Sequence, residues 1–186
     1  MTRLYSEIFC TAVEIGFNFC CVSYDIKIIN LKKVQIKKGQ ILQSKGELNT
    51  KVYIVKSGLL QSYAIDKKGK EHIFMFAPEG WVLGDSVAPH LPSELFIDAL
   101  EDTEAIIIEK NRDNPDVNKL LNRLHVLQKR IIMLMSTSAI ERYEHFIETY
   151  PNITQRIPQR MIASYLGITP EALSKLKAER KKKRNS

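Results

Sequence analysis

The sequence predicts an α+β protein in which a cupin-like β-roll leads into a long helix and then a helix-turn-helix without a full wing. Three observations support this prediction. Short apolar runs separated by Gly turns fill the first half of the chain, a heptad-spaced apolar seam follows, and two short helical patterns joined by a Gly come last. The expected domains are a roll at 1–112, a helical linker and dimerisation region at 113–150, and a helix-turn-helix domain at 151–186.

The β region runs from about residue 34 to residue 110, where strand-like runs alternate with turn signals. Strands are expected at 52–55, 60–65, 72–76, 95–100 and 104–109. Trp81 and three Phe residues of this region could line a pocket, but ordinary packing in the roll core explains them more simply. Residues 1–30 are expected to form a short helix and a lead-in strand.

The region from residue 115 to residue 150 has a helical pattern with apolar residues at alternating spacings of four and three. The predicted dimer helix carries Leu120, Leu124, Leu127, Ile131 and Leu134 in this seam. One amphipathic helix packed on its own sheet would explain the seam, and so would a parallel pair of helices from two subunits. We favour the homodimer because two-fold DNA sites are read by two-fold proteins.

Residues 159–183 have the spacing of a helix-turn-helix. Ala163 allows two helices to cross closely, and Gly167 falls where the chain must turn in the left-handed region. Thr169 is expected as the N-cap of the second helix and Pro170 as its first residue. A plain helical hairpin with a solvated basic face is the alternative. We favour DNA binding because the exposed face is basic as well as correctly shaped.

The net charge is +7, and much of the excess lies in the basic run at 175–184. Such a balance suits a polyanionic partner, here double-stranded DNA. No apolar segment is long enough to span a bilayer and no signal peptide is found, so we expect a cytoplasmic protein without a membrane partner. The odd set of Cys10, Cys20 and Cys21 predicts reduced thiols, and neither a metal nor a cofactor is expected.

With this order of elements, the chain resembles the Crp/Fnr family of bacterial transcription regulators over about residues 33–180. Residues 46 and 52–58 are similar to the Gly-spaced strands of the cyclic-nucleotide-binding fold, and residues 80–85 are similar to the start of its phosphate-binding cassette. In that cassette Asp85 stands where the family has the Glu that meets the ribose hydroxyl. The resemblance implies a ligand pocket at Trp81, Gly84, Asp85 and Ser93.

The resemblance also implies base reading by the second helix, where the family pattern Glu-x-x-Ser-Arg appears as Glu171, Ser174 and Lys175. These positions share one helix face. Glu171 can accept a hydrogen bond from a cytosine amino group and Lys175 can donate to guanine, although Lys lacks the planar fork of Arg. The candidates for phosphate contact are Arg156, Gln159, Arg160, Thr169, Lys177, Arg180, Lys181, Lys182 and Lys183.

Three features depart from the family pattern. No Arg or Lys lies between Asp85 and Ala99, and Glu94 is acidic, so the sequence predicts that cyclic AMP does not bind tightly. The Cys residues lack the spacing of the iron–sulfur members, and His72 and His90 are more simply structural or solvated than haem ligands. We expect no β-hairpin wing of the kind that commonly follows the second helix. Either the basic tail could replace its phosphate contacts, or the second helix could run longer.

Two other classes of protein are alternatives to a DNA-binding regulator. A cupin-type enzyme needs clustered His and carboxylate ligands, whereas Glu71, His72 and His90 show no tight His-x-His spacing, so no enzyme is expected. A ligand-binding or interaction module of the cyclic-nucleotide fold without a DNA role is the second alternative, and the basic helix argues against it. RNA polymerase is a further candidate partner, and the sequence leaves the effector molecule open.

Overall fold

The computed structural model describes residues 32–85, 87, 88, 90–108 and 117–185, which form eight strands and four α-helices. The chain divides into two compact units. The first comprises residues 1–64 and 74–127, and the second comprises residues 65–73 and 128–186. The expected structure of residues 1–30, together with the three cysteines, lies outside the described residues.

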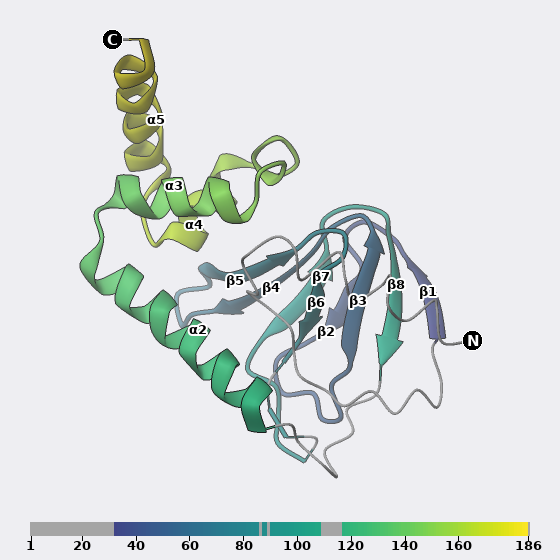
Figure 1. The fold of residues 1–186 in the computed structure, drawn as a ribbon. Helices are drawn as coiled ribbons and strands as arrows, with labels where there is room; N and C mark the ends of the chain where they lie inside the picture. The colour runs from purple at the N-terminus through teal and green to yellow at the C-terminus, as the bar shows by residue number, and fades with distance from the viewer. Residues whose placement is uncertain (1–31, 86, 89, 109–116, 186) are drawn as a thin grey trace. The chain divides into compact units, whose positions relative to one another are not determined.

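The first half of the chain folds into the predicted roll, which consists of two four-stranded sheets (Figure 1). The strands are β1 Lys32–Ile36, β2 Ile41–Gln43, β3 Val52–Ser57, β4 Leu60–Ile65, β5 Glu71–Ala77, β6 Val82–Gly84, β7 Phe96–Ala99 and β8 Thr103–Ile108. The strand orders are β1-β8-β3-β6 and β2-β7-β4-β5, and the registered pairs are antiparallel. The α+β prediction is confirmed.

Alternate residues of the strands build the core between the two sheets. Tyr53 and Val55 of β3 and Leu60 of β4 are buried in one cluster, against which Phe74 and Trp81 pack. The simpler interpretation of Phe74 and Trp81 as core residues is therefore confirmed. The strand expected at 60–65 has the predicted bounds, whereas β1 and the three-residue strands β2 and β6 were not among the expected strands.

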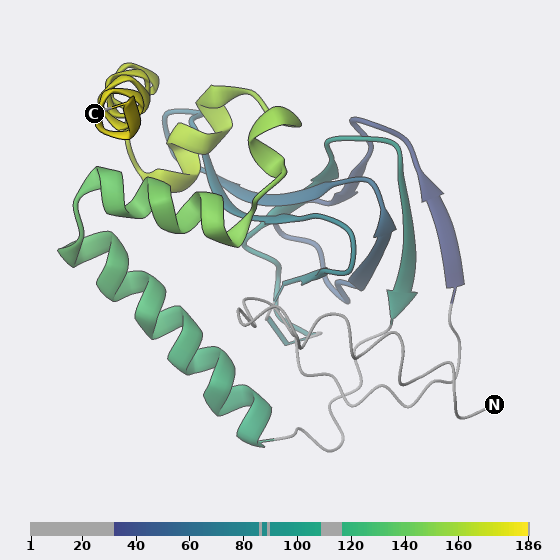
Figure 2. The same cartoon turned by 45° about the horizontal axis from the view of Figure 1, so that its top comes forward.

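The helical part begins with α2 Val117–Ser136 and α3 Ala139–Thr149 and continues through the 3-10 turn Ile153–Gln155 to α4 Gln159–Leu166 and α5 Pro170–Asn185. The helical region expected up to residue 150 is thus divided by a sharp bend (Figure 2). Ser138 causes the break as N-cap of α3. Its hydroxyl accepts from Glu141 N, and Glu141 Oε2 accepts from Ser138 N at 2.7 Å, which forms a capping box.

Three aromatic rings form the centre of the helical unit. Phe146 lies 5.3 Å from Tyr150 and 5.2 Å from Tyr165 between ring centroids. The Arg130 guanidinium carbon lies 4.4 Å from the centroid of the Tyr165 ring. Because these residues come from α2, α3 and α4, the cluster joins the three helices.

Among the described residues, none of the helices combines the length and apolarity needed to cross a membrane.

Candidate nucleic-acid interface and roll cassette

The turn between α4 and α5 has the predicted geometry. Gly167 is in the left-handed region with φ 68° and donates from its N–H to Ser164 O, while Ile168 N donates to Ala163 O. These two bonds close α4 in a Schellman motif. Thr169 Oγ1 accepts from Ala172 N at 3.2 Å, and α5 begins at Pro170. The expected turn, N-cap and first helical position are all confirmed.

One face of the α4–α5 pair is buried in the core of the helical unit. Ile162 and Leu173 are fully buried, and Ala163 is 1% exposed, which permits the close crossing that its small side chain predicts. The sides of α5 that point away from this core carry polar and charged groups. Packing therefore fixes which face of α5 is available to a partner.

The three predicted base-reading residues of α5 are exposed. Hydrogen bonds from its own backbone N–H and from the Thr169 hydroxyl hold the pKa of Glu171 below its usual value, so its carboxylate stays charged at neutral pH. The Ser174 hydroxyl donates to Pro170 O at 3.0 Å, which leaves its oxygen as an acceptor. Glu171 and Ser174 thus offer acceptors, and Lys175 offers the donor.

The predicted phosphate contacts fall into two groups. Lys177 Nζ and Arg180 Cζ each lie 5.9 Å from the centroid of the Tyr143 ring on α3, and Arg180 Nε lies 4.0 Å from Glu144 Oε1. These two cations lean against α3. The side chains of Gln159, Arg160, Thr169, Lys181 and Lys182 are exposed, Arg156 is half-buried, and the side chain of Lys183 lies outside the described residues.

The predicted dimer seam on α2 is largely exposed in the single chain. Leu124 is 62% exposed, Ile131 57% and Leu134 38%, whereas Leu127 is half-buried. The side chain of Leu120 lies outside the described residues. Exposure of several large apolar residues on one helix is typical of a surface that another chain covers.

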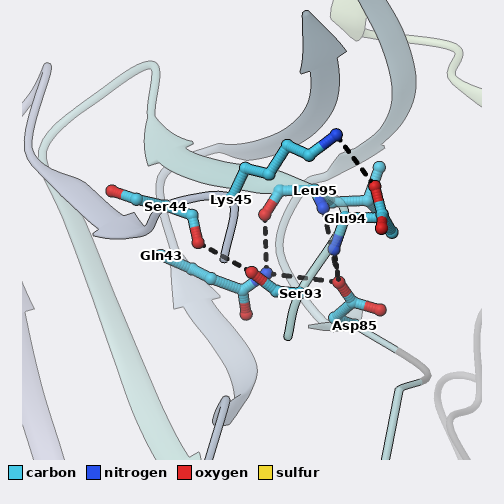
Figure 3. Close-up of polar contacts among 7 residues, drawn as sticks. All are labelled: Gln43, Ser44, Lys45, Asp85, Ser93, Glu94 and Leu95. Carbon is cyan, nitrogen blue, oxygen red and sulfur yellow. Dashed lines mark hydrogen bonds and ion pairs between the residues drawn. The ribbon is translucent and has the colours of Figure 1, made fainter. Parts of the chain in front are cut away.

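In the roll, Asp85 follows β6 and is 5% exposed (Figure 3). Its Oδ2 accepts from Glu94 N at 3.2 Å and from Leu95 N at 3.4 Å, and its Oδ1 accepts from Val87 N at 3.1 Å. Gln43 Nε2 donates to Leu95 O at 2.8 Å and lies 3.5 Å from Asp85 Oδ2. Neither the backbone donors nor Gln43 had been predicted as part of the site.

Ser93 fastens the cassette to the loop after β2. Its hydroxyl donates to Ser44 O at 2.7 Å, its N–H donates to Glu47 O at 2.9 Å, and its carbonyl accepts from Gly46 N at 2.8 Å. An ion pair of 3.0 Å between Lys45 Nζ and Glu94 Oε2 lies beside these bonds. Both donors of Ser93 are therefore already used within the chain.

The four residues of the predicted pocket have different roles. Asp85 and Ser93 belong to the cluster drawn in Figure 3, whereas Trp81 packs against the roll core. At Gly84 a Cβ atom would meet Val52 Cγ2 at 3.0 Å and Lys51 O at 3.2 Å, so this glycine allows close packing against β3. The predicted set therefore contains two cluster residues and two packing residues.

The histidines considered as ligands lie on the surface. His72 Nε2 is 2.9 Å from Asp66 Oδ2, and His90 is exposed. Within the part of the chain that the structure describes, no group of three or more His, Cys, Asp or Glu residues is arranged to hold a metal ion.

The comparison with known proteins agrees with this architecture. A family model described as the cyclic nucleotide-binding domain matches residues 33–113. The fumarate and nitrate reduction regulatory protein of Escherichia coli is 30% identical over 172 residues, which cover 78% of this chain and 67% of that protein. The chain belongs to the Crp/Fnr family. The Escherichia coli relative of this Crp/Fnr protein is named as a regulatory protein.

Further similarities show how far this Crp/Fnr chain extends along its relatives. The anaerobic regulatory protein of Aggregatibacter actinomycetemcomitans is 28% identical over 172 residues, and the chain spans 65% of its length. FixK2 from Bradyrhizobium japonicum has a similar fold, with a TM-score of 0.67 at 20% identity, over 83% of this chain and 86% of that one. A CRP/FNR regulator from Thermus thermophilus has a TM-score of 0.55 at 17% identity, over 82% and 87%.

Proposed function

We propose that this Crp/Fnr protein is a sequence-specific regulator of transcription that binds double-stranded DNA through α5. The observation that carries this proposal is the arrangement of α4 and α5. The Gly167 turn and the buried Leu173 hold α5 against α4, while Glu171 and Lys175 are exposed one turn apart. A helix held in this way can lie in the major groove and present one donor and two acceptors to base edges.

The charge of α5 supports the same proposal. Lys181 and Lys182 continue the helix beyond the base-reading residues and are exposed. Cations at these positions can neutralise phosphates on either side of the groove without reading sequence. Lys177 and Arg180 lean on Tyr143, and we propose that they brace α5 and supply a longer-range positive field.

We propose that the regulator acts as a homodimer through α2. The exposed apolar residues of that helix, among them Leu124 and Ile131, would be covered by the same helix of a second copy. A parallel pair relates the two DNA-binding units by a two-fold axis. A two-fold repeated DNA site is the expected consequence.

We further propose that the roll does not bind cyclic AMP. The backbone donors of Glu94 and Leu95 are bonded to Asp85, and the donors of Ser93 are bonded to the loop after β2. A cyclic phosphate would have to replace these bonds, and it would lie beside the buried Asp85 carboxylate. Placing two anions together in a buried site strongly opposes binding.

Selection of duplexes from a random pool by the purified full chain tests the DNA-binding proposal. We expect enrichment of one two-fold repeated motif, and binding of that motif should weaken steeply as salt concentration rises. Retention of random duplexes without enrichment, or failure to bind any duplex in dilute buffer, would refute it. Isothermal titration with cyclic AMP separately tests the proposal that the roll does not bind cyclic AMP, and saturable micromolar binding would contradict it.

A further inference from the structure

We propose that the cassette of the roll is a built anion site whose resident occupant is the chain's own Asp85 carboxylate. This inference deepens the proposal that the roll does not bind cyclic AMP, and it does not depend on DNA binding. The site would take a small carboxylate or phosphate in place of the Asp85 side chain once that side chain is removed.

The donors of the site converge on a single carboxylate. Backbone N–H groups of Glu94 and Leu95 point at Oδ2 from 3.2 and 3.4 Å, and the N–H of Val87 points at Oδ1 from 3.1 Å. The amide of Gln43 approaches Oδ2 to 3.5 Å from β2 (Figure 3). Converging backbone N–H groups of this kind form a concavity that binds anions.

The burial of Asp85 shows that these donors compensate the free-energy cost of removing its carboxylate from water. The residue is only 5% exposed, and a buried carboxylate is retained only where hydrogen bonds replace its lost water. Bonds from N–H groups to an ionised oxygen are stronger than bonds between neutral groups. The three N–H groups therefore form a site that stabilises negative charge. Without an anion in this site, these buried donors would be unsatisfied.

The same carboxylate connects three segments of the roll, of which β2 is 42 residues away in the sequence. It follows β6, it receives two bonds from the residues directly before β7, and Gln43 reaches it from β2. Ser93, directly before these donors, fastens the loop after β2 by three hydrogen bonds. We infer that Asp85 does the organising that a bound effector anion would otherwise do, so the cassette is formed without a ligand.

Chemical rescue of Asp85→Ala in the full chain tests this inference. The variant should unfold several degrees below the wild-type chain, and formate or acetate should restore part of that shift in a saturable way. The wild-type chain should show no such response beyond that to sodium chloride at equal ionic strength. Inorganic phosphate, in a parallel titration, reports whether the vacated site also accepts a tetrahedral anion, and either anion acting alone supports the proposal.

Two further variants keep the test decisive. Asp85→Asn preserves shape but not charge, so it should melt below the wild-type chain and should not respond to formate, because its amide fills the site. Asp102→Ala is the matched control. Asp102 also accepts from a backbone N–H, that of Lys38 at 2.9 Å, but its side chain is 66% exposed, so formate should not rescue its loss.

The outcomes separate the possibilities. If Asp85→Ala responds to formate and phosphate no more than Asp102→Ala does, or if Asp85→Asn melts with the wild-type chain, the resident-anion proposal is wrong. Should Asp85→Ala fail to fold, the Asp85→Asn comparison still decides. Because melting involves no DNA, a protein that shows rescue but binds no duplex would refute the proposed function alone.

Discussion

The guanidinium of Arg130 stacks on the ring of Tyr165, with its central carbon 4.4 Å from the ring centroid. Arg130 is only 8% exposed, and Tyr165 also contacts Phe146. Burial raises the pKa of the Tyr165 hydroxyl, whereas the nearby Arg130 charge acts in the opposite direction. The contact fastens the second half of α2 to α4, the first helix of the helix-turn-helix.

Arg130→Lys should lower the free energy of unfolding by about 1 kcal/mol, because an ammonium group has no planar face that could stack on the ring. Urea unfolding monitored by circular dichroism measures the change. Lys129→Arg is the control. The side chain of Lys129, which directly precedes Arg130, is exposed and should tolerate the substitution. Equal midpoints for Arg130→Lys and the wild-type chain would show that stacking contributes nothing.

Lys175→Ala and Lys181→Ala should weaken DNA binding in different ways. Loss of Lys175 should relax sequence preference at one base position by about 1–3 kcal/mol, because Lys175 is expected to contact a base. Loss of Lys181 should weaken binding to specific and random duplexes alike and reduce the salt slope by about 1. Affinities for matched and scrambled duplexes at several salt concentrations separate the two, and identical behaviour of both variants would contradict the assignment.

Leu124→Glu should dissociate the proposed dimer, because it puts a charge into the apolar seam of α2. Sedimentation should then show monomers, and affinity for a two-fold DNA site should fall by at least about tenfold, which corresponds to about 1.4 kcal/mol. Asn122→Glu, on the same helix but outside the seam, should leave the association unchanged. Persistence of the dimer in Leu124→Glu would exclude α2 as its interface.

Tyr53 should make the roll sensitive to alkali. Burial, with a smaller contribution from Glu47, raises the pKa of Tyr53 to about 12 from an ordinary value of 10.0. The folded state thus favours the neutral phenol. The stability that this provides is complete below pH 10 and is lost as the pH rises from 10 through 12.

Tyr53→Phe tests the sign of this dependence. At pH 8 the variant should be less stable by about 1 kcal/mol, because it lacks the hydrogen bond of 3.3 Å from Tyr53 Oη to Leu42 O. The difference should shrink between pH 10 and pH 12, where the wild-type phenol ionises and Phe does not. Urea unfolding at pH 8 and pH 11 measures it, and a constant difference would contradict the buried phenol.

The sequence was most informative where backbone geometry depends on residue type. Gly167 in the left-handed region, Thr169 as N-cap and Pro170 at the first position each follow from local chemistry, and each is confirmed. The break at Ser138 was missed, although Ser138 and Glu141 carry a capping-box spacing, because the apolar pattern continues across it. The strands β2 and β6 are too short for periodicity to reveal them.

The cassette shows a different limit. The lack of a basic residue near Asp85 could be read from the sequence, and it predicted poor binding of cyclic AMP. The hydrogen bonds from the backbone of Val87, Glu94 and Leu95 could not be predicted, since main-chain N–H groups are present in every non-Pro residue and only the fold aims them. The stack of Arg130 on Tyr165 likewise depends on tertiary packing.

The bend between α2 and α3 is stiffened on both sides. Besides the capping box of Ser138, Arg142 Nη1 donates to Leu134 O at 3.0 Å, and Thr137 Oγ1 donates to Met133 O at 2.6 Å. Because of these hydrogen bonds, the junction between α2 and α3 is not a flexible linker. We therefore expect a rotation of the second half of α2 about its axis to move α3 with it.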